Sequence, residues 1–109
     1  MTALAEPRRG EIWLADLDKR RPVVILTRDP LGRLLHSVII GPITSTIRGL
    51  STEVPVGPED GVRVASVVNL DNLQLLDRRL LRRKVGQLSA IRMAEICTSA
   101  TIAIGRDFG

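Results

Sequence analysis

The stretch Arg20–Thr27, "RRPVVILT", decides the fold of this 109-residue chain. Two arginines and a proline precede an unbroken apolar run, and such a run is typical of a strand buried on both faces. Pro22 fixes its own φ and cannot donate a ladder hydrogen bond, so it favours the start of a strand. The sequence therefore predicts a central, buried strand with two cationic side chains at its entrance.

Further strands are predicted on both sides of this one. The segment "GEIWLADLD", Gly10–Asp18, alternates in polarity and predicts the first strand. After a turn at "DPLGRL", Asp29–Leu34, the segment "HSVIIGPIT", His36–Thr44, predicts a third strand with a bulge or strand end at Gly41-Pro42. Shorter strands are expected in three later segments: Glu53–Val56, Arg63–Leu70 and the basic stretch Asp77–Gly86.

The last segment predicts the one helix of the chain. Ser89 is a suitable N-cap and Gly105 stands where a C-cap belongs. Helical spacing predicts that five side chains form the buried stripe: Met93, Ile96, Cys97, Ala100 and Ile104. Strands followed by a closing helix indicate a small β-barrel of the α+β class, rich in β structure. We expect a single domain over residues 1–109, with residues 1–8 as a loose tail.

Composition narrows the possible functions. Lys and Arg number 16 against 12 Asp and Glu, a net charge of +4. This excess indicates either an anionic partner, which would be nucleic acid or an acidic protein, or simply a basic surface. One His and one Cys exclude a disulfide or a structural zinc site within one chain, and we expect no metal or other cofactor. The single Cys and the lack of a long apolar run predict a cytoplasmic protein without a membrane span.

Two strand ends form the candidate site. If the strand ending at Thr44 runs antiparallel to the strand starting at Arg21, these two residues lie side by side. A guanidinium binds a phosphate through two parallel hydrogen bonds, and a hydroxyl can hold a further phosphate oxygen. This pair is a minimal phosphate site that needs no metal ion. Taken alone, each residue also suits an ordinary surface position at a strand end.

The segments "GEIWLADLD", "RPVVILT" and "PITST", followed by the helix, resemble in this order the MazF/PemK toxin family. The resemblance implies an SH3-like barrel that forms a homodimer, cuts single-stranded RNA at short sequences and is neutralised by an acidic, MazE-like antitoxin. It implies catalytic roles for Arg21 and Thr44. RNA carries its own nucleophile, the 2′-hydroxyl, so the expected products are a 2′,3′-cyclic phosphate and a 5′-hydroxyl.

Further RNA contacts are expected near the two strand ends. Four side chains are candidates: Asp16, Arg20, Thr46 and Arg48. Asp16 would either orient Arg21 through an ion pair or be an ordinary carboxylate at a strand end. The basic segment Arg78–Lys84 is expected to contact RNA or the antitoxin. Trp13 is expected in core or dimer packing, with stacking on a base as the alternative.

One departure from the family pattern leaves alternatives open. Many relatives have a long loop between the first two strands, whereas only Asp18-Lys19-Arg20 separates Leu17 from Arg21 here. Because that loop reads bases in relatives, the short loop leaves substrate specificity open. The alternatives are a non-catalytic toxin of the same fold that poisons DNA gyrase, and a catalytically degenerate RNA-binding barrel. Of these functions, only the nuclease needs both Arg21 and Thr44.

Overall fold

The computed structural model describes residues 5–29 and 34–105, so the expected turn at residues 30–33 and the first four residues of the tail lie outside the described residues. The elements, in chain order, are β1 (Glu11–Asp16), β2 (Arg20–Ile25), β3 (Ser37–Thr44), β4 (Glu53–Val56), η1 (Pro58–Asp60), β5 (Ser66–Asn69), η2 (Leu70–Asn72), β6 (Gln74–Asp77), η3 (Arg78–Leu80), β7 (Leu81–Gln87) and α2 (Ala90–Ile104). Each strand predicted from the sequence is present. None of the helices within these ranges is long and apolar enough to cross a membrane.

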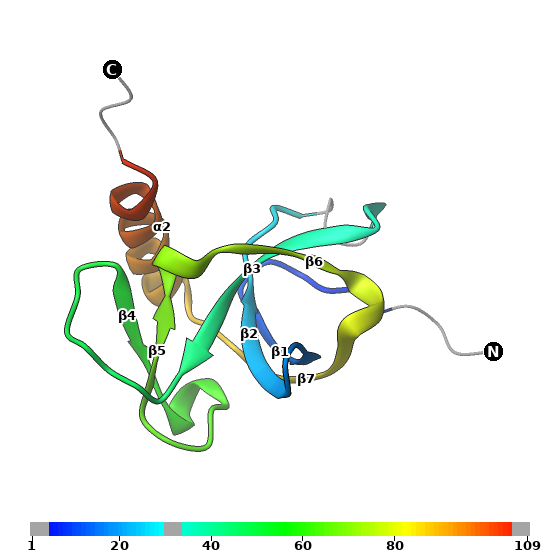
Figure 1. The fold of residues 1–109 in the computed structure, drawn as a ribbon, viewed down its shortest axis with the longest axis horizontal. Helices are drawn as coiled ribbons and strands as arrows, with labels where there is room; N and C mark the ends of the chain where they lie inside the picture. The colour runs from blue at the N-terminus through cyan, green and yellow to red at the C-terminus, as the bar shows by residue number, and fades with distance from the viewer. Residues whose placement is uncertain (1–4, 30–33, 106–109) are drawn as a thin grey trace.

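The strands form one antiparallel sheet in the order β4-β5-β3-β2-β1-β7, and β6 pairs with β3 beside this path. Figure 1 shows the sheet curling round, with α2 beside β4 and β5. The predicted class, a strand-rich α+β fold with a C-terminal helix, is confirmed. The sheet is open, however, because β4 and β7 end the hydrogen-bonded path and do not pair with each other in the described ranges.

Strand β3 is continuous through Gly41-Pro42, so the predicted bulge or strand end is wrong. Its first half pairs with β6 and its last two residues pair with β5, while β2 lies along the other edge. The dipeptide therefore marks the point where β3 changes partner. A Cβ atom on Gly41 would lie 2.9 Å from Cγ1 of Val68, which explains why glycine stands at this crossing.

The prediction of a central strand buried on both faces is confirmed for β2. Val23, Val24 and Ile25 are all 0% exposed. Val24 belongs to the core cluster that α2 covers, whereas Val23 and Ile25 belong to a second cluster on the opposite face. Burial of three branched aliphatic side chains stabilises this strand by roughly 1.5–3 kcal/mol for each. The start of β2 is therefore attached to a fully buried part of the core.

Helix α2 begins and ends as predicted. The Ser89 hydroxyl oxygen accepts a hydrogen bond from the Arg92 N–H, and Gly105 closes the helix at φ +87°. The prediction for Cys97 is wrong, because its side chain is exposed and accepts a hydrogen bond from Arg9 at 2.9 Å. The prediction for Ile104 is wrong too, because its side chain is 56% exposed. Ile96 is buried as predicted, at 1% exposed, and Met93 and Ala100 are partly buried against the same core cluster.

The N-terminal tail is held in place from its fifth residue onward, contrary to the expected loose tail over residues 5–8. Pro7 is fully buried. The buried Arg78 donates from Nε to the carbonyl oxygen of Ala5 and from Nη1 to that of Leu35, at 3.0 Å each. Arg78, the first arginine of the basic segment, therefore has a structural role: it links the N-terminal tail to the residues just before β3.

Candidate functional site

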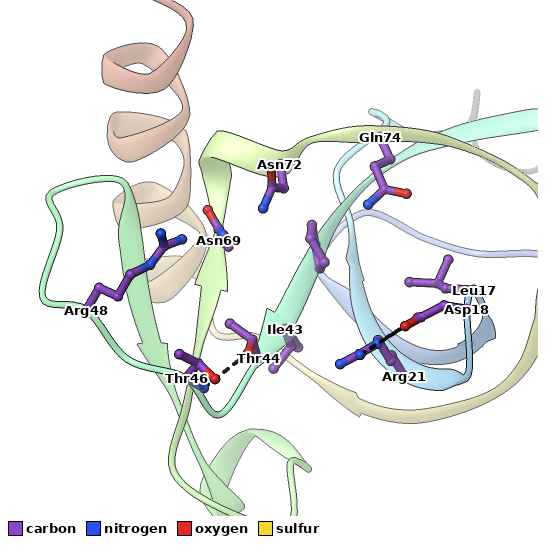
Figure 2. Close-up of a pocket in the computed structure, with 11 residues that line it drawn as sticks. Leu17, Asp18, Arg21, Ile43, Thr44, Thr46, Arg48, Asn69, Asn72 and Gln74 are labelled. Atoms are coloured by element: carbon purple, nitrogen blue, oxygen red, sulfur yellow. Dashed lines mark hydrogen bonds and ion pairs between the residues drawn. The ribbon is translucent and has the colours of Figure 1, made fainter.

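The predicted antiparallel pairing of the two strand ends is confirmed. The β2–β3 ladder runs from Ile25 opposite Ile40 to Val23 opposite Pro42, so Arg21 and Thr44 both lie just beyond the same end of it. Both side chains line a surface groove of about 590 Å³, shown in Figure 2. The geometry follows from two rigid strands, and such elements hold a functional group more accurately than a mobile loop does.

Arg21 is held by a neighbouring carboxylate. Its Nε donates to Oδ1 of Asp18 at 2.9 Å and its Nη2 donates to Oδ2 at 3.2 Å. Figure 2 marks the interaction between the two side chains. The hydrogen bonds from Arg21 lower the pKa of Asp18 to about 2, and Asp18 in turn raises the pKa of Arg21 above its usual value. Arg21 therefore stays cationic at every physiological pH.

The expected ion pair between Asp16 and Arg21 is wrong. Asp16 instead accepts hydrogen bonds from Arg82 and, at 3.1 Å, from Nε of Arg20, and these two guanidiniums lower its pKa. Asp16 is at the end of β1 opposite Arg20, whereas Asp18 is in the turn beyond. The turn, and not the strand, supplies the carboxylate for Arg21.

Thr44 has a local hydrogen bond that leaves its proton available. The Thr44 Oγ1 accepts the N–H of Thr46 at 3.1 Å, drawn as a dashed line in Figure 2. A hydroxyl has one donor and two acceptor positions, so accepting this bond orients the oxygen and leaves the hydrogen free to be donated. The Thr44 side chain is half-buried at the groove.

A second groove of about 800 Å³ adjoins the first one. The two grooves share four residues: Arg21, Ile43, Thr44 and Thr46. Five further cationic side chains line the second groove: Lys19, Arg20, Arg63, Arg83 and Lys84. No carboxylate is among the described residues that line it. The Arg21–Thr44 pair thus stands at the boundary between a strongly basic groove and a more neutral one.

The more neutral groove carries an amide wall, which we define as Asn69, Asn72 and Gln74. Figure 2 shows these side chains across the groove from Arg21 and Asp18. Side-chain amides donate and accept hydrogen bonds, and they are suited to the edges of unpaired bases. Asn72 and Gln74 are exposed, whereas Asn69 is 4% exposed and its Oδ1 already accepts the Asp71 N–H at 3.0 Å. This wall was not predicted from the sequence. A signal was present in the spacing of three amides within "NLDNLQ", Asn69–Gln74.

The other predicted RNA contacts are divided between the grooves. Arg20 lines the basic groove, Arg48 lines the amide-walled groove and Thr46 lines both, whereas Asp16 lines neither. Glu53 places Arg48, because its Oε1 accepts the N–H of Arg48 at 3.0 Å and its Oε2 lies 3.7 Å from the Arg48 Nε.

Of the basic segment Arg78–Lys84, only the last two residues reach a groove. Arg83 and Lys84 line the basic groove, and Oε2 of Glu11 holds the Lys84 ammonium at 3.1 Å.

Trp13 packs against the second core cluster, so its predicted core role is confirmed. Within residues 5–29 and 34–105, no three His, Cys, Asp or Glu side chains gather as a metal site.

Comparison with known proteins gives a consistent result. Residues 8–104 match the family described as PemK-like, MazF-like toxin of type II toxin–antitoxin system. The chain is 41% identical over 107 residues to a probable endoribonuclease, MazF5, of Mycobacterium tuberculosis strain H37Rv, covering 95% of this chain and 96% of that protein.

Solved structures agree with the family match. The Mycobacterium tuberculosis toxin MazF-mt6 superposes with a TM-score of 0.83 at 41% identity, over 86% of this chain and 95% of that one. An endoribonuclease in complex with its cognate antitoxin, from a mycobacterial species, superposes with a TM-score of 0.84 at 28% identity, over 94% and 99%. The chain therefore belongs to the PemK-like, MazF-like toxin family of type II toxin–antitoxin systems.

Proposed function

We propose that the chain is a sequence-selective endoribonuclease toxin that cuts single-stranded RNA at the Arg21–Thr44 pair. The observation that carries the proposal is the position of this pair, at the boundary between a basic groove and an amide-walled groove. The basic groove suits a run of phosphates, and the amide wall suits the edges of bases. The names of the similar mycobacterial proteins support the same activity.

The chemistry is a transesterification within the RNA. The 2′-oxygen attacks the neighbouring phosphorus and loses its proton, the bond from phosphorus to the 5′-oxygen breaks, and that oxygen takes up a proton. The products are a 2′,3′-cyclic phosphate and a 5′-hydroxyl. The nucleophile belongs to the substrate, so the proposed step needs no metal ion or other cofactor.

Arg21 and Thr44 stabilise the charge that develops on the phosphate oxygens. Preorganised donors aimed at developing charge commonly contribute more to catalysis than any other single effect. The salt bridge to Asp18 raises the pKa of Arg21, and this favours charge stabilisation over proton transfer by that side chain. The Thr44 hydroxyl donates to a second phosphate oxygen.

The proposed partners follow from the same surface. An acidic, MazE-like antitoxin segment would occupy the basic groove and exclude RNA. A structure of a similar mycobacterial endoribonuclease in complex with its cognate antitoxin supports an antitoxin partner. We propose that the toxin acts as a homodimer in the cytoplasm. In the second candidate function, gyrase poisoning, the Arg21–Thr44 pair would be dispensable.

The test is cleavage of a long single-stranded RNA in EDTA, comparing the wild type with Arg21→Ala and mapping the new ends. The matched control is Arg79→Ala, because Arg79 is an exposed arginine paired with Asp77 that lines neither groove. We expect discrete cuts with 5′-hydroxyl ends from the wild type and the control, and a rate lower by about 10²–10³ but still measurable from Arg21→Ala. A folded wild type that leaves RNA intact but inhibits gyrase supercoiling would select the gyrase function.

A further inference from the structure

We propose that Asp18 is a positioning residue for Arg21, and that the short turn between β1 and β2 exists here to deliver its carboxylate. This inference rests on the proposed nuclease function. The pairing of Asp16 with Arg20 closes the hairpin, so the turn contains three residues, Leu17, Asp18 and Lys19. The turn is tightened by a hydrogen bond from the Leu17 N–H to the Lys19 carbonyl oxygen at 3.1 Å.

The two hydrogen bonds to Asp18 use one edge of the Arg21 guanidinium and leave the other edge free. Asp18 accepts from Nε at 2.9 Å and from Nη2 at 3.2 Å. A guanidinium has five N–H donors, so both hydrogens on Nη1 and the second hydrogen on Nη2 remain. These form the end-on fork that binds a phosphate through two parallel hydrogen bonds. The carboxylate therefore fixes the direction of the fork without occupying it.

Asp18 is not expected to strengthen the binding of RNA. Asp18 is the one carboxylate among the described residues that line the two grooves. A negative charge there repels a polyanionic substrate. A role in stability is small too, because the Asp18 side chain is 69% exposed and exposed ion pairs contribute little to folding. The benefit of Asp18 is therefore expected in the turnover step.

The chain contains a matched control for this pair. Arg79 donates to Asp77 with the same atoms, Nε at 3.2 Å and Nη2 at 2.8 Å, and the pKa of Asp77 is likewise about 2. Neither Asp77 nor Arg79 lines a groove. Asp77→Asn therefore removes an equivalent surface charge and an equivalent ion pair at a distance from the cutting site.

The experiment measures kcat and KM on a defined single-stranded RNA, together with melting temperatures, for Asp18→Asn, Asp18→Ala, Asp18→Glu and Asp77→Asn. We expect Asp18→Asn and Asp18→Ala to lower kcat about 10- to 100-fold with KM equal to or below the wild-type value. Asp18→Glu should recover part of the loss, since it restores the charge with a longer reach. Asp77→Asn should retain wild-type kcat and KM, and all four variants should melt close to the wild type.

A double variant separates this role from others. Adding Asp18→Asn to Arg21→Ala should cause no further loss in the single-turnover rate, because Asp18 acts through Arg21. Wild-type kcat in Asp18→Asn, or a raised KM with a lowered melting temperature, would overturn the positioning role. If Arg21→Ala is slowed while Asp18→Asn cuts normally, the positioning role alone fails. If the wild type does not cut RNA, both proposals fail.

Discussion

Replacing Thr44 by valine tests whether the groove holds a hydroxyl donor at the reacting phosphate. Valine has nearly the same shape, so the substitution removes the hydroxyl and little else. Loss of one preorganised donor to a developing oxyanion costs about 10²–10³ in kcat, or about 2.7–4 kcal/mol. The stability cost is smaller: the bond from the Thr46 N–H at 3.1 Å is partly open to water, and its loss costs about 0.5–1.5 kcal/mol.

The assay is single-turnover cleavage of a fluorescently labelled RNA, with melting followed by circular dichroism. Thr44→Ser retains the hydroxyl and should keep most of the rate. Thr101→Val is the matched control, because Thr101 is an exposed threonine on α2 whose hydroxyl donates to the Cys97 carbonyl oxygen at 2.9 Å. Thr44→Val should lose the rate and a few degrees of melting temperature, whereas Thr101→Val should lose no rate.

Two results would refute this reasoning. A Thr44→Val rate within about threefold of the wild type, less than 1 kcal/mol of barrier, would mean that the hydroxyl does not meet the developing charge. An equal loss in Thr44→Ser and Thr44→Val would assign the effect to the methyl group and to packing, and not to hydrogen bonding.

Three further predictions concern charge and packing. Arg63 lines the basic groove, so Arg63→Ala should weaken binding of a non-cleavable 2′-deoxy RNA analogue. Measured by fluorescence anisotropy, the slope of log affinity against log salt concentration should fall by about 0.7. An unchanged slope would mean that Arg63 does not contact the RNA. Asp18 and Asp77 have folded pKa values of about 2 against 3.8 unfolded, so their stabilisation is present above about pH 4 and is lost as the pH falls toward 2. Both ion pairs are exposed, so the urea midpoint should decline only slightly over that window and Asp77→Asn should make the decline only slightly shallower. A steep decline that Asp77→Asn abolishes would contradict this assignment. Gly86→Ala should destabilise the fold by about 1–3 kcal/mol, because the new Cβ would clash with the Asp60 carbonyl oxygen. An unchanged melting temperature would show that the backbone around Asp60 moves away at no cost.

The position of Arg21 and Thr44 at one site could be predicted from the sequence because it depends on the antiparallel pairing of β2 and β3. Two apolar runs joined by one turn pair antiparallel, and the end of one then lies beside the start of the other. The carboxylate partner could not be predicted in the same way. Alternation along β1 put Asp16 in line with the site, but the conformation of a three-residue turn decides that Asp18 reaches Arg21.

Other errors have similarly non-local causes. Gly41-Pro42 looked like a strand end because the change of partner from β6 to β5 depends on segments far along the chain. Cys97 lies one residue, and so about 100° of helical rotation, from the buried Ile96, and periodicity alone does not fix where the buried stripe ends. The amide wall spans β5, η2 and β6, so three elements must fold before it exists.

The two arginines at the mouth of the buried strand have different surroundings for a physical reason. They are adjacent on β2, so the pleat sends their side chains to opposite faces. Arg20 pairs with Asp16 on the neighbouring strand and lines only the basic groove, the one proposed to hold substrate phosphates. Arg21 pairs with Asp18 from the turn and lines both grooves. Because Val23, Val24 and Ile25 of β2 are 0% exposed, the strand holds the backbone of both arginines on a buried support, and under the proposed function selectivity is expected to arise from how RNA fits this frame.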